Sequence, residues 1–342
     1  MQAPENFKEY IIAFEKKLEL VVVDDITGAL YIKKYLAHLL QHKKYYLVIY
    51  ADVLHKLVQH SSKNKSGILL IDYGAGNGLL GMFAKFCGFK KVFLNDIDAK
   101  FIHASEKLAE QLNIKMDGYI PGDISAVQAY FKNEFPDAII GTDVIEHIYN
   151  LNSFFKAIQQ MNQSMVTVFT TASNPDNYFK VSMLKKMQLK DEMEGGTPGD
   201  HIFFGESPLE PFLNIREQII RKHSGDLPGL KIHVLAKATR GMNEQDIIAA
   251  VDQYNISGQL PVPPHGTNTC DPLSGCWTER ILPVKAYTFL YNSAGFTTTF
   301  YNGFYNIYET GFKNYLKKIL NAGIAIFGKK IAPYIIIAGH KK

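Results

Sequence analysis

A buried-strand pattern that ends in an acid and a glycine-rich turn constrains this chain most. Residues 68–71 are four apolar residues in a row, and the acid and the glycines follow directly within residues 72–78. An uninterrupted apolar run is typical of a parallel strand that is buried on both faces. Beyond Gly78 the apolar residues recur at helical spacing as far as Phe86. The order strand, glycine loop, helix predicts a loop whose backbone can approach a ligand closely.

The spacing of the glycines indicates which ligand the loop suits. A dinucleotide fingerprint has its third glycine at the sixth place, and counted from Gly74 that place is occupied by Leu79. The strand also ends in Asp72, and a carboxylate repels a pyrophosphate but attracts an ammonium group. The loop therefore favours a cationic nucleoside without phosphate, S-adenosylmethionine, over NAD.

The following segments agree with a nucleoside site. Residues 91–96 form a second predicted strand that ends in Asp96, 20 residues after Gly76, where an acid can accept both ribose hydroxyls. A third predicted strand covers residues 117–120, and Asp123 follows it near the expected adenine edge. Further strands are predicted over residues 137–141 and 166–171, and residues 142–148 are expected to open the helix after the fourth strand.

These motifs, in this order, resemble those of the class I S-adenosylmethionine-dependent methyltransferases. The resemblance covers about residues 60–175 and, more weakly, a last strand over residues 334–338. It implies an α/β fold, a doubly wound, mostly parallel seven-stranded Rossmann-like sheet. It also implies these cofactor contacts: Asp72, Gly74, Ala75 and Gly76 at the methionine moiety, Asp96 and Ile97 at ribose and adenine, Asp123 and Ile124 at adenine, and Asp143 and Val144 beside them. Asp98 is an alternative to Asp96, which is preferred because it stands where the strand should end.

Length and patterning divide the 342 residues into four parts. Residues 1–62 are predicted to form an N-terminal helical extension, and residues 63–175 the cofactor-binding core. Residues 286–342 supply the last helix and the closing strands, so residues 176–285 are an insertion relative to the family pattern. Within it, helices are predicted over 215–223 and 244–254, the second capped by Asn243.

The insertion contains a long segment that is rich in Pro, Gly, Asn and Thr, over residues 258–275. Such a segment does not favour regular structure, and long irregular loops in compact domains are usually functional or disordered. This one and the residues after it hold reactive and aromatic side chains, namely His265, Cys270, Asp271, Cys276, Trp277, Glu279 and Arg280. We therefore interpret the insertion as a substrate lid, more mobile without ligand than with it. The spacing of its two cysteines is not that of a zinc site.

The candidate catalytic groups follow the fourth predicted strand. Asp143, Glu146 and His147 stand at i, i+3 and i+4, which would place them on one face of a helix. His147 is the candidate general base, with Glu146 beside it; alternatively both only orient the loop. Some family members, among quinone-pathway O-methyltransferases and small-RNA terminal methyltransferases, hold a divalent metal with a similar Glu-x-x-Glu-His set. His201 could then add a ligand or act on the substrate, but a metal is not part of the expectation.

Composition narrows the partners and the compartment. The net charge is +4, and the lysine clusters are short and lack interleaved aromatic residues, so a nucleic-acid substrate is disfavoured. Three cysteines do not make a disulfide framework, which fits a reducing cytoplasm. The polar first residues do not resemble a signal peptide, and residues 319–339 are interrupted by Lys329, Lys330 and Pro333. We expect a cytoplasmic protein with no membrane partner.

The expected function is methyl transfer to a small-molecule acceptor, with oxygen favoured as the methylated atom. An enclosing lid and an aromatic content of 12% suit an aromatic or amphipathic acceptor. Two alternatives stay open at this point: a protein or RNA methyltransferase, and a regulator that binds S-adenosylmethionine without catalysis. The sequence does not indicate the oligomeric state.

Overall fold

The computed structural model describes residues 4–196, 210–263, 266–308 and 311–341. The chain divides into two compact units. The sheet unit contains the residues up to 145, residues 150–177 and the residues from 283 on. The helical unit contains residues 178–282 together with the short segment 146–149. The N-terminal helices therefore belong to the same compact unit as the sheet.

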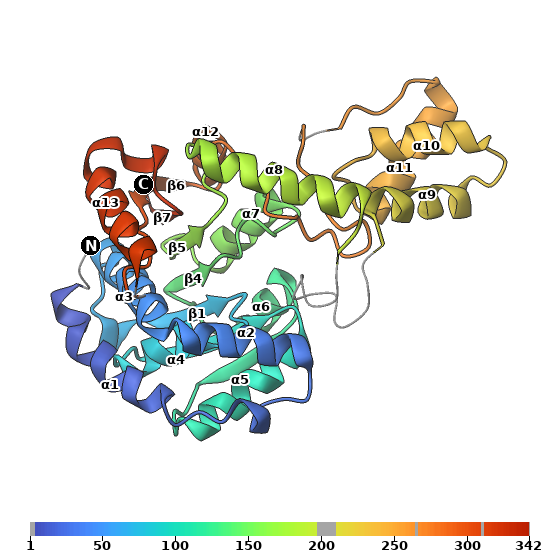
Figure 1. Ribbon diagram of the computed structural model, residues 1–342. Helices are drawn as coiled ribbons and strands as arrows, with labels where there is room; N and C mark the ends of the chain where they lie inside the picture. The colour runs from blue at the N-terminus through green and yellow to red at the C-terminus, as the bar shows by residue number, and fades with distance from the viewer. Residues whose placement is uncertain (1–3, 197–209, 264–265, 309–310, 342) are drawn as a thin grey trace. The chain divides into compact units, whose positions relative to one another are not determined.

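The sheet unit is built on seven strands in the order β3-β2-β1-β4-β5-β7-β6 (Figure 1). Strands β1 to β5 pair in parallel, whereas β7 pairs antiparallel with both β5 and β6. The bounds are Leu69–Tyr73 for β1, Lys91–Asp96 for β2, Gly118–Pro121 for β3, Ala138–Thr142 for β4, Val166–Thr171 for β5, Phe296–Asn302 for β6 and Ile335–Lys341 for β7. The prediction of a mostly parallel seven-stranded sheet is confirmed.

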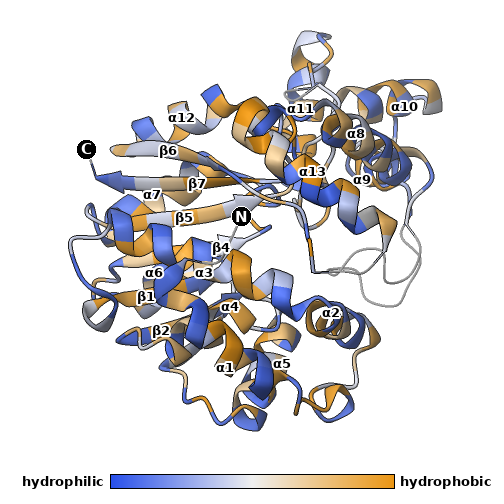
Figure 2. Cartoon of the chain, turned by 60° about the vertical axis from the view of Figure 1, so that its left-hand side comes forward, coloured by the Kyte–Doolittle hydropathy of each residue, from blue (hydrophilic) through white to orange (hydrophobic). Residues whose placement is uncertain are grey.

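Buried apolar strands explain why the sheet is covered on both faces. Strand β1 is buried at every position, and β4 and β5 are almost entirely buried, as two-sided coverage requires. Helices α3, α4 and α5 contact the sheet, as do α6 and α12, while α7 packs against α6 and α12 (Figures 1 and 2). The helices of this unit are α1 Lys8–Leu18, α2 Leu30–Gln41, α3 Lys43–His60, α4 Leu79–Phe86, α5 Ala99–Gln111, α6 Ile124–Tyr130, α7 Leu151–Met161, α12 Val284–Ser293 and α13 Phe312–Phe327.

The helical unit has its own apolar core. Its helices are α8 Tyr178–Met193, α9 Phe212–His223, α10 Gly229–Ala238 and α11 Glu244–Ser257. The core is formed by side chains of α9, α10 and α11, among them Phe212, Ile220, Leu235, Ile247 and Val251. The predicted cap of α11 is confirmed, because the Asn243 side chain accepts a hydrogen bond of 3.0 Å from the backbone N–H of Asp246.

Buried polar side chains of α8 bind the irregular segment near the end of this unit. Arg216 and Glu192 form a buried ion pair, and the Thr269 hydroxyl donates to Glu192 over 2.7 Å. The Gln188 amide donates to the backbone oxygens of Thr278 and Glu279 over 3.1 and 2.9 Å. The predicted lack of regular structure over residues 258–275 is confirmed for the described residues 258–263 and 266–275, and polar side chains of α8 fix the segment 266–281 in place.

The structure corrects one expectation about elements. Residues 142–148 do not open a helix: after β4 the chain forms turns, and α7 begins only at Leu151, where the Asn150 side chain accepts from the backbone N–H of Ser153. Helices α8, α10 and α13 were not predicted from the sequence. Residues 319–327 are the second half of α13, and Lys329 and Lys330 lie beyond its end.

None of the helices in the part of the chain that the structure describes combines the length and the apolar character that a transmembrane span requires.

Helix α4 lies so close to strand β2 that Gly81 has no room for a side chain. A β-carbon added there would lie 2.2 Å from Cδ2 of Leu94 and 3.1 Å from a carboxylate oxygen of Asp72. Both neighbours are buried, so they cannot swing into solvent. We predict that Gly81→Ala lowers the free energy of unfolding by about 1–3 kcal/mol, the usual cost of overpacking a core.

The measurement is chemical denaturation of Gly81→Ala beside a matched variant, Gly67→Ala. At Gly67 an added β-carbon would meet its nearest atom at 3.6 Å, an ordinary contact distance. A Gly81→Ala protein as stable as Gly67→Ala would contradict the close approach of α4 to the sheet.

Candidate functional site

The predicted cofactor residues lie at one edge of the sheet unit. Strands β1 to β4 run parallel, so their carboxyl ends meet at the same edge. The following predicted residues stand at or just after those ends: Asp72, Gly74, Ala75, Gly76, Asp96, Ile97, Asp123, Ile124, Asp143 and Val144. The topology therefore brings all ten predicted cofactor residues to a common edge.

Asp72 is the most deeply buried of the acids at this edge. Its side chain lies in β1, is 1% exposed, and accepts a hydrogen bond of 2.8 Å from the backbone N–H of Gly81. Burial raises the pKa of Asp72 to about 8, the Gly81 amide opposes this, and the charge of Asp96 adds to the rise. A positively charged ligand beside Asp72 would favour its ionised form.

The glycine loop between β1 and α4 has a left-handed backbone at three positions. Gly74, Gly76 and Gly78 have φ angles of 65°, 53° and 76°. A β-carbon at Gly74 would lie 2.3 Å from Cγ2 of Val144, so the loop after β4 packs directly on the loop after β1. The loop therefore requires glycine at these positions both for its conformation and, at Gly74, for its packing.

Asp96 is held by the backbone of two loops. One carboxylate oxygen accepts from the backbone N–H of Gly76 over 2.8 Å, and the other accepts from that of Asp98 over 2.9 Å. Burial raises the pKa of Asp96 to about 6, and these amides lower it. Each oxygen retains a second lone pair with which it can accept from a hydroxyl.

Asp98, the alternative to Asp96, has a structural role in this fold. Its side chain caps α5 by accepting from the backbone N–H of Lys100 over 2.8 Å, and it accepts from the Tyr31 hydroxyl over 2.6 Å. Asp98 therefore caps α5 and holds α2 to the loop between β2 and α5, whereas Asp96 stands at the end of β2.

Asp123 also caps a helix. It accepts from the backbone N–H groups of Ser125 and Ala126 over 2.9 and 3.3 Å at the start of α6. Ile97, after β2, is 62% exposed, and Ile124 is partly exposed. An apolar, accessible side chain and a cap with backbone amides at the sheet edge suit a flat heterocycle better than a charged group.

Asp143 occupies a strained turn rather than a helix. Its φ angle is 50°, which is uncommon for a residue with a side chain, and its carboxylate accepts from the backbone N–H of Ala172 over 3.1 Å. The prediction that Asp143, Glu146 and His147 share one helix face is therefore wrong. Asp143 and Val144 belong to the sheet unit, while Glu146 and His147 belong to the helical unit.

A tyrosine of the N-terminal helices, Tyr35, lies beside the glycine loop. A β-carbon added at Gly76 would lie 3.1 Å from Cε1 of Tyr35, a residue of α2. Burial and the charges of Asp143, Asp96 and Asp72 raise the pKa of Tyr35 above its usual range. Tyr46 and Tyr50 of α3 are shifted in the same direction by burial and by the charge of Asp143. The amphipathic pattern of these helices was visible in the sequence, but not the surface they cover.

Glu146 and His147 form a cluster with Glu279 within the helical unit. Each of these residues offers one ligand atom, and the three atoms lie within 4.8 Å of one another. Backbone pairing holds the cluster, because the N–H of Trp277 donates to the oxygen of His147 over 3.2 Å and the N–H of Arg280 donates to that of Glu146 over 3.3 Å. Glu279 has a φ angle of 45°, so its position is strained.

The hydrogen bonds of His147 indicate its tautomer. Nδ1 lies 2.8 Å from the backbone oxygen of Trp277, which can only accept, so Nδ1 carries a proton. Nε2 faces Glu279 at 3.9 Å. Burial opposes protonation, but contact with Cys276 and the charges of Glu279 and Glu146 raise the pKa of His147 well above its ordinary value. Nε2 can therefore hold a proton between the carboxylates, or a divalent metal ion in its place.

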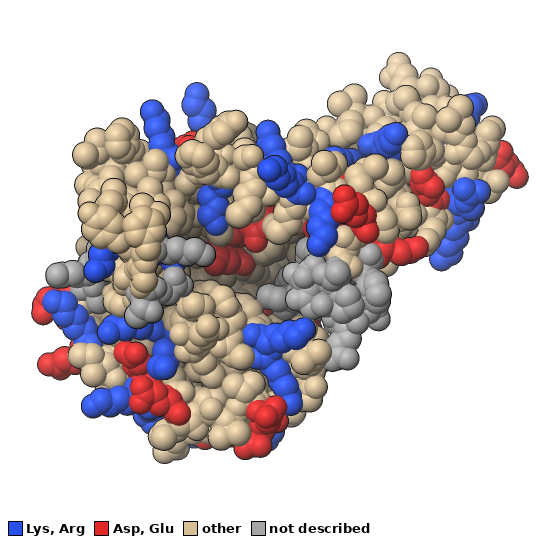
Figure 3. Space-filling model, in the orientation of Figure 1, with Lys and Arg blue, Asp and Glu red and all other residues tan. Residues whose placement is uncertain are grey.

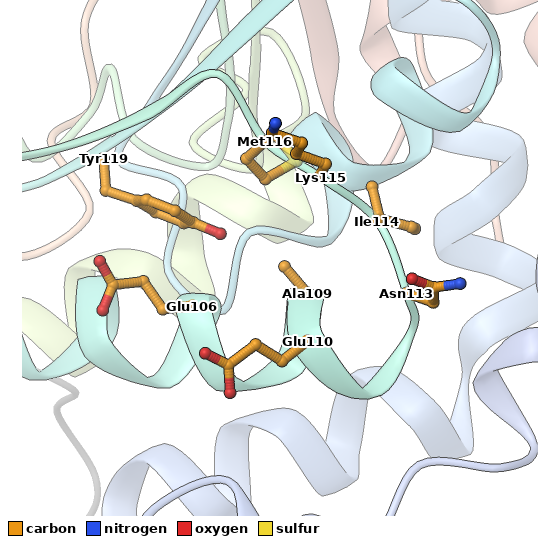
Figure 4. A pocket seen from close by; sticks show the side chains of 8 residues that line it. All are labelled: Glu106, Ala109, Glu110, Asn113, Ile114, Lys115, Met116 and Tyr119. Atoms are coloured by element: carbon orange, nitrogen blue, oxygen red, sulfur yellow. The ribbon is translucent and has the colours of Figure 1, made fainter.

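Two further histidines named by the sequence, His201 and His265, lie outside the described residues. A hollow between α5 and β3 is lined by Glu106, Glu110, Asn113, Lys115, Met116 and Tyr119, among others (Figure 4). It contains none of the predicted cofactor or catalytic residues.

Comparison with known proteins gives short sequence matches and solved structures of limited similarity. No family model matches the chain. It is 32% identical over 84 residues to a ribosomal protein L11 methyltransferase of Psychrobacter sp. (strain PRwf-1), a match that covers 24% of this chain and 27% of that protein. It is 20% identical over 133 residues to a ubiquinone biosynthesis O-methyltransferase of Rickettsia akari (strain Hartford), covering 39% of this chain and 51% of that protein.

Among solved structures, an S-adenosylmethionine-dependent methyltransferase from Mesorhizobium loti matches with a TM-score of 0.41 and 12% identity, over 85% of this chain and 96% of that one. The chain spans between about a quarter and a half of the length of the two curated relatives named above. Both relatives are named as methyltransferases, one of ribosomal protein L11 and the other of ubiquinone biosynthesis.

The burial of Asp72 leads to a prediction about pH and stability. Its folded-state pKa of about 8 lies above the ordinary value of 3.8, so ionisation destabilises the folded state increasingly as the pH rises from about 4 to 8. Asp72→Asn removes this penalty and keeps an oxygen that accepts from Gly81. We predict that the thermal midpoint of Asp72→Asn, minus that of the wild type, grows between pH 5 and pH 8 in the absence of ligand.

Thermal unfolding monitored at several pH values is the measurement, and Asp123→Asn is its control, because that carboxyl is exposed and Asn also caps helices well. A difference for Asp72→Asn that is constant with pH would show that Asp72 is ionised throughout.

Proposed function

We propose that the chain is a class I S-adenosylmethionine-dependent methyltransferase and that it transfers a methyl group from S-adenosylmethionine to a small-molecule acceptor, with oxygen as the favoured atom. The observation that carries the proposal is the pair of buried carboxyls, Asp72 and Asp96, beside a glycine loop with a left-handed backbone.

The chemistry of the donor set fits this cofactor. The groups that shift the pKa of Asp72 and Asp96 are burial, backbone amides and other carboxylates, and none of them is a basic side chain of the described residues. An edge of this kind suits the ammonium and sulfonium charges of S-adenosylmethionine and opposes a pyrophosphate. The methionine moiety would lie at Asp72 and the glycine loop, ribose at Asp96, and adenine near Ile97, Asp123 and Ile124.

When bound, S-adenosylmethionine supplies a methyl group on a positively charged sulfur, which is already a good leaving group. The protein then needs to align the acceptor and to accept its proton where the acceptor carries one. We propose that His147 and Glu146 serve this step. In the sequence His147 follows Val144 by three residues, and its ring can accept a proton at Nε2 only in the neutral form, which the neighbouring carboxylates disfavour.

The choice of a small acceptor rests on the aromatic side chains at this edge. Tyr35 covers Gly76, and Tyr46 and Tyr50 lie near enough to Asp143 to respond to its charge. Such a surface suits a compact aromatic or amphipathic molecule. The relatives that methylate ribosomal protein L11 favour a protein acceptor as the second candidate, and a regulator that binds the cofactor without turnover is the third.

The first prediction from this proposal concerns cofactor affinity. S-adenosylhomocysteine should bind, and NAD should not. Asp96→Ala should weaken S-adenosylhomocysteine binding at least tenfold, because hydrogen bonds to a charged group contribute about 1.5–3 kcal/mol each. Asp98→Asn, which keeps the cap of α5, should change the affinity little. The measurement is isothermal titration calorimetry.

Equal losses of S-adenosylhomocysteine affinity for Asp96→Ala and Asp98→Asn would contradict the assignment of the ribose contact to Asp96 alone. Micromolar binding of NAD without binding of S-adenosylhomocysteine would overturn the assignment of the cofactor.

The second prediction concerns turnover. Incubation with methyl-tritiated S-adenosylmethionine and a fractionated cell extract should label the small-molecule fraction rather than protein or RNA. His147→Gln should reduce this labelling by roughly 10²–10⁴-fold while cofactor affinity stays nearly unchanged. His223→Gln is the matched control, because that histidine forms a partly exposed ion pair with Asp252 in the same unit.

A chelator separates the two roles of His147. If the cluster holds a metal, the chelator reproduces the loss in the wild type and added Mg²⁺, Mn²⁺ or Zn²⁺ reverses it. If only the protein fraction is labelled, the acceptor is a protein and not a small molecule. A fully active, stable His147→Gln enzyme would exclude both the base and the metal role.

A further inference from the structure

Helix α13 presents its apolar side to solvent. Its large apolar residues recur at positions i, i+3, i+4 and i+7, so they share one face of the helix. All of them but Ile324 are exposed, namely Phe312, Tyr315, Leu316, Ile319, Leu320, Ile326 and Phe327, with 76% exposure at Phe312 and 80% at Ile326. We call this set the apolar face of α13. In a monomeric protein such a stripe normally faces the core.

Polar contacts on the opposite side fix this orientation. The Asn321 side chain accepts from the backbone N–H of Tyr305 over 2.7 Å and donates to the backbone oxygen of the same residue over 3.0 Å. Ile324 is buried on that side. The helix is therefore held to the sheet unit by its polar side and cannot turn its apolar face inward without breaking both hydrogen bonds.

The sequence of this helix and of the residues after it carries charge of one sign. Residues 312–342 contain seven lysines and neither Asp nor Glu. Lys318 lies in α13 and is exposed, and Lys330 follows the helix and is exposed, whereas Lys329 lies 3.7 Å from a carboxylate oxygen of Asp176. In the view of Figure 3, the surface over α13 consists mainly of uncharged atoms, with Lys or Arg around it. The apolar face thus belongs to a strongly basic part of the chain.

We propose that α13 binds the surface of a membrane that contains anionic lipids. A helix whose apolar face is bordered by lysines lies in the interface plane, with its apolar side chains among the acyl chains and its lysines at the anionic headgroups. A second copy of this chain fits less well, because a two-fold contact of α13 with itself would bring the two sets of lysines together. This mode of binding requires no spanning helix, and none lies within the residues that the structure describes.

The test is flotation of the full chain with vesicles of phosphatidylcholine alone and with vesicles that contain about one-third phosphatidylglycerol, at low and high salt. Binding is expected to the anionic vesicles, at least tenfold weaker to the neutral ones, and weakened by salt. The double variant Phe312→Asp with Ile326→Asp should bind at least tenfold less. The matched control, Leu20→Asp with Ile256→Asp, alters two side chains of 80% and 82% exposure on other helices or loops and should bind as the wild type does.

No binding to either vesicle would overturn the proposal, as would equal binding to both. The molar mass from light scattering is measured in parallel. A dimer that is lost in the Phe312→Asp, Ile326→Asp variant, without vesicle binding, would assign the face to a second copy, and a lipid-independent protein complex lost in the same variant would assign it to a protein partner. Circular dichroism of the variant checks that the fold is retained, and methyl transfer is not needed as a readout.

Discussion

The carboxyl group of Asp72 is the constraint on which the sheet edge depends. It lies near the end of a strand that is buried on both faces, so it can be neither solvated nor moved, and it accepts a hydrogen bond from the backbone N–H of Gly81. That bond requires α4 to begin close to β1, which leaves no space for a side chain at Gly81. Burial raises the pKa of Asp72 and makes its ionisation costly. A cationic ligand beside the carboxylate would offset this cost. The ionised form of Asp72 therefore lowers the stability of the ligand-free protein but favours the binding of a cationic ligand.

The helical unit solves a different problem, that of holding an irregular segment. Residues 266–281 bury Thr269, Cys270 and Asp271 although they form almost no regular structure. Their backbone groups are satisfied by side chains of α8, above all the Gln188 amide, and by the backbone of residues 146–149. As a result Glu279 takes a strained conformation next to His147. Two carboxylates and one imidazole in this position are compatible with a shared proton or with a metal ion, and the raised pKa of His147 follows from the same charges that would attract a cation.

The sequence predicted the elements whose pattern is local. Strands β2 and β5 have the predicted bounds, and β1, β3, β4 and β7 differ from theirs at their ends, because a buried strand is visible as an apolar run. The prediction from the sequence was wrong after β4, where Asp143 adopts a left-handed backbone conformation that the hydrophobic periodicity does not reveal. It also could not reveal that Glu279, 132 residues beyond His147 in the chain, completes the cluster, or that Tyr35 covers Gly76. These contacts depend on tertiary packing, and the residue types alone do not specify them. The proposed roles of the site residues and of residues 176–285 as a lid stay predictions.

The orientation of an amphipathic helix is likewise a property of its tertiary contacts. The composition of residues 312–327 shows a helix with one apolar and one polar face, and the usual inference would bury the apolar one. Asn321 decides otherwise, because its two hydrogen bonds to the backbone of Tyr305 are satisfied only when the polar side faces the sheet unit. The net charge of the whole chain conceals the second half of the pattern, since the last 31 residues contain seven lysines and no acid. An apolar face held outward by polar contacts, in a strongly basic stretch of the sequence, has the two properties by which proteins attach to an anionic bilayer without crossing it.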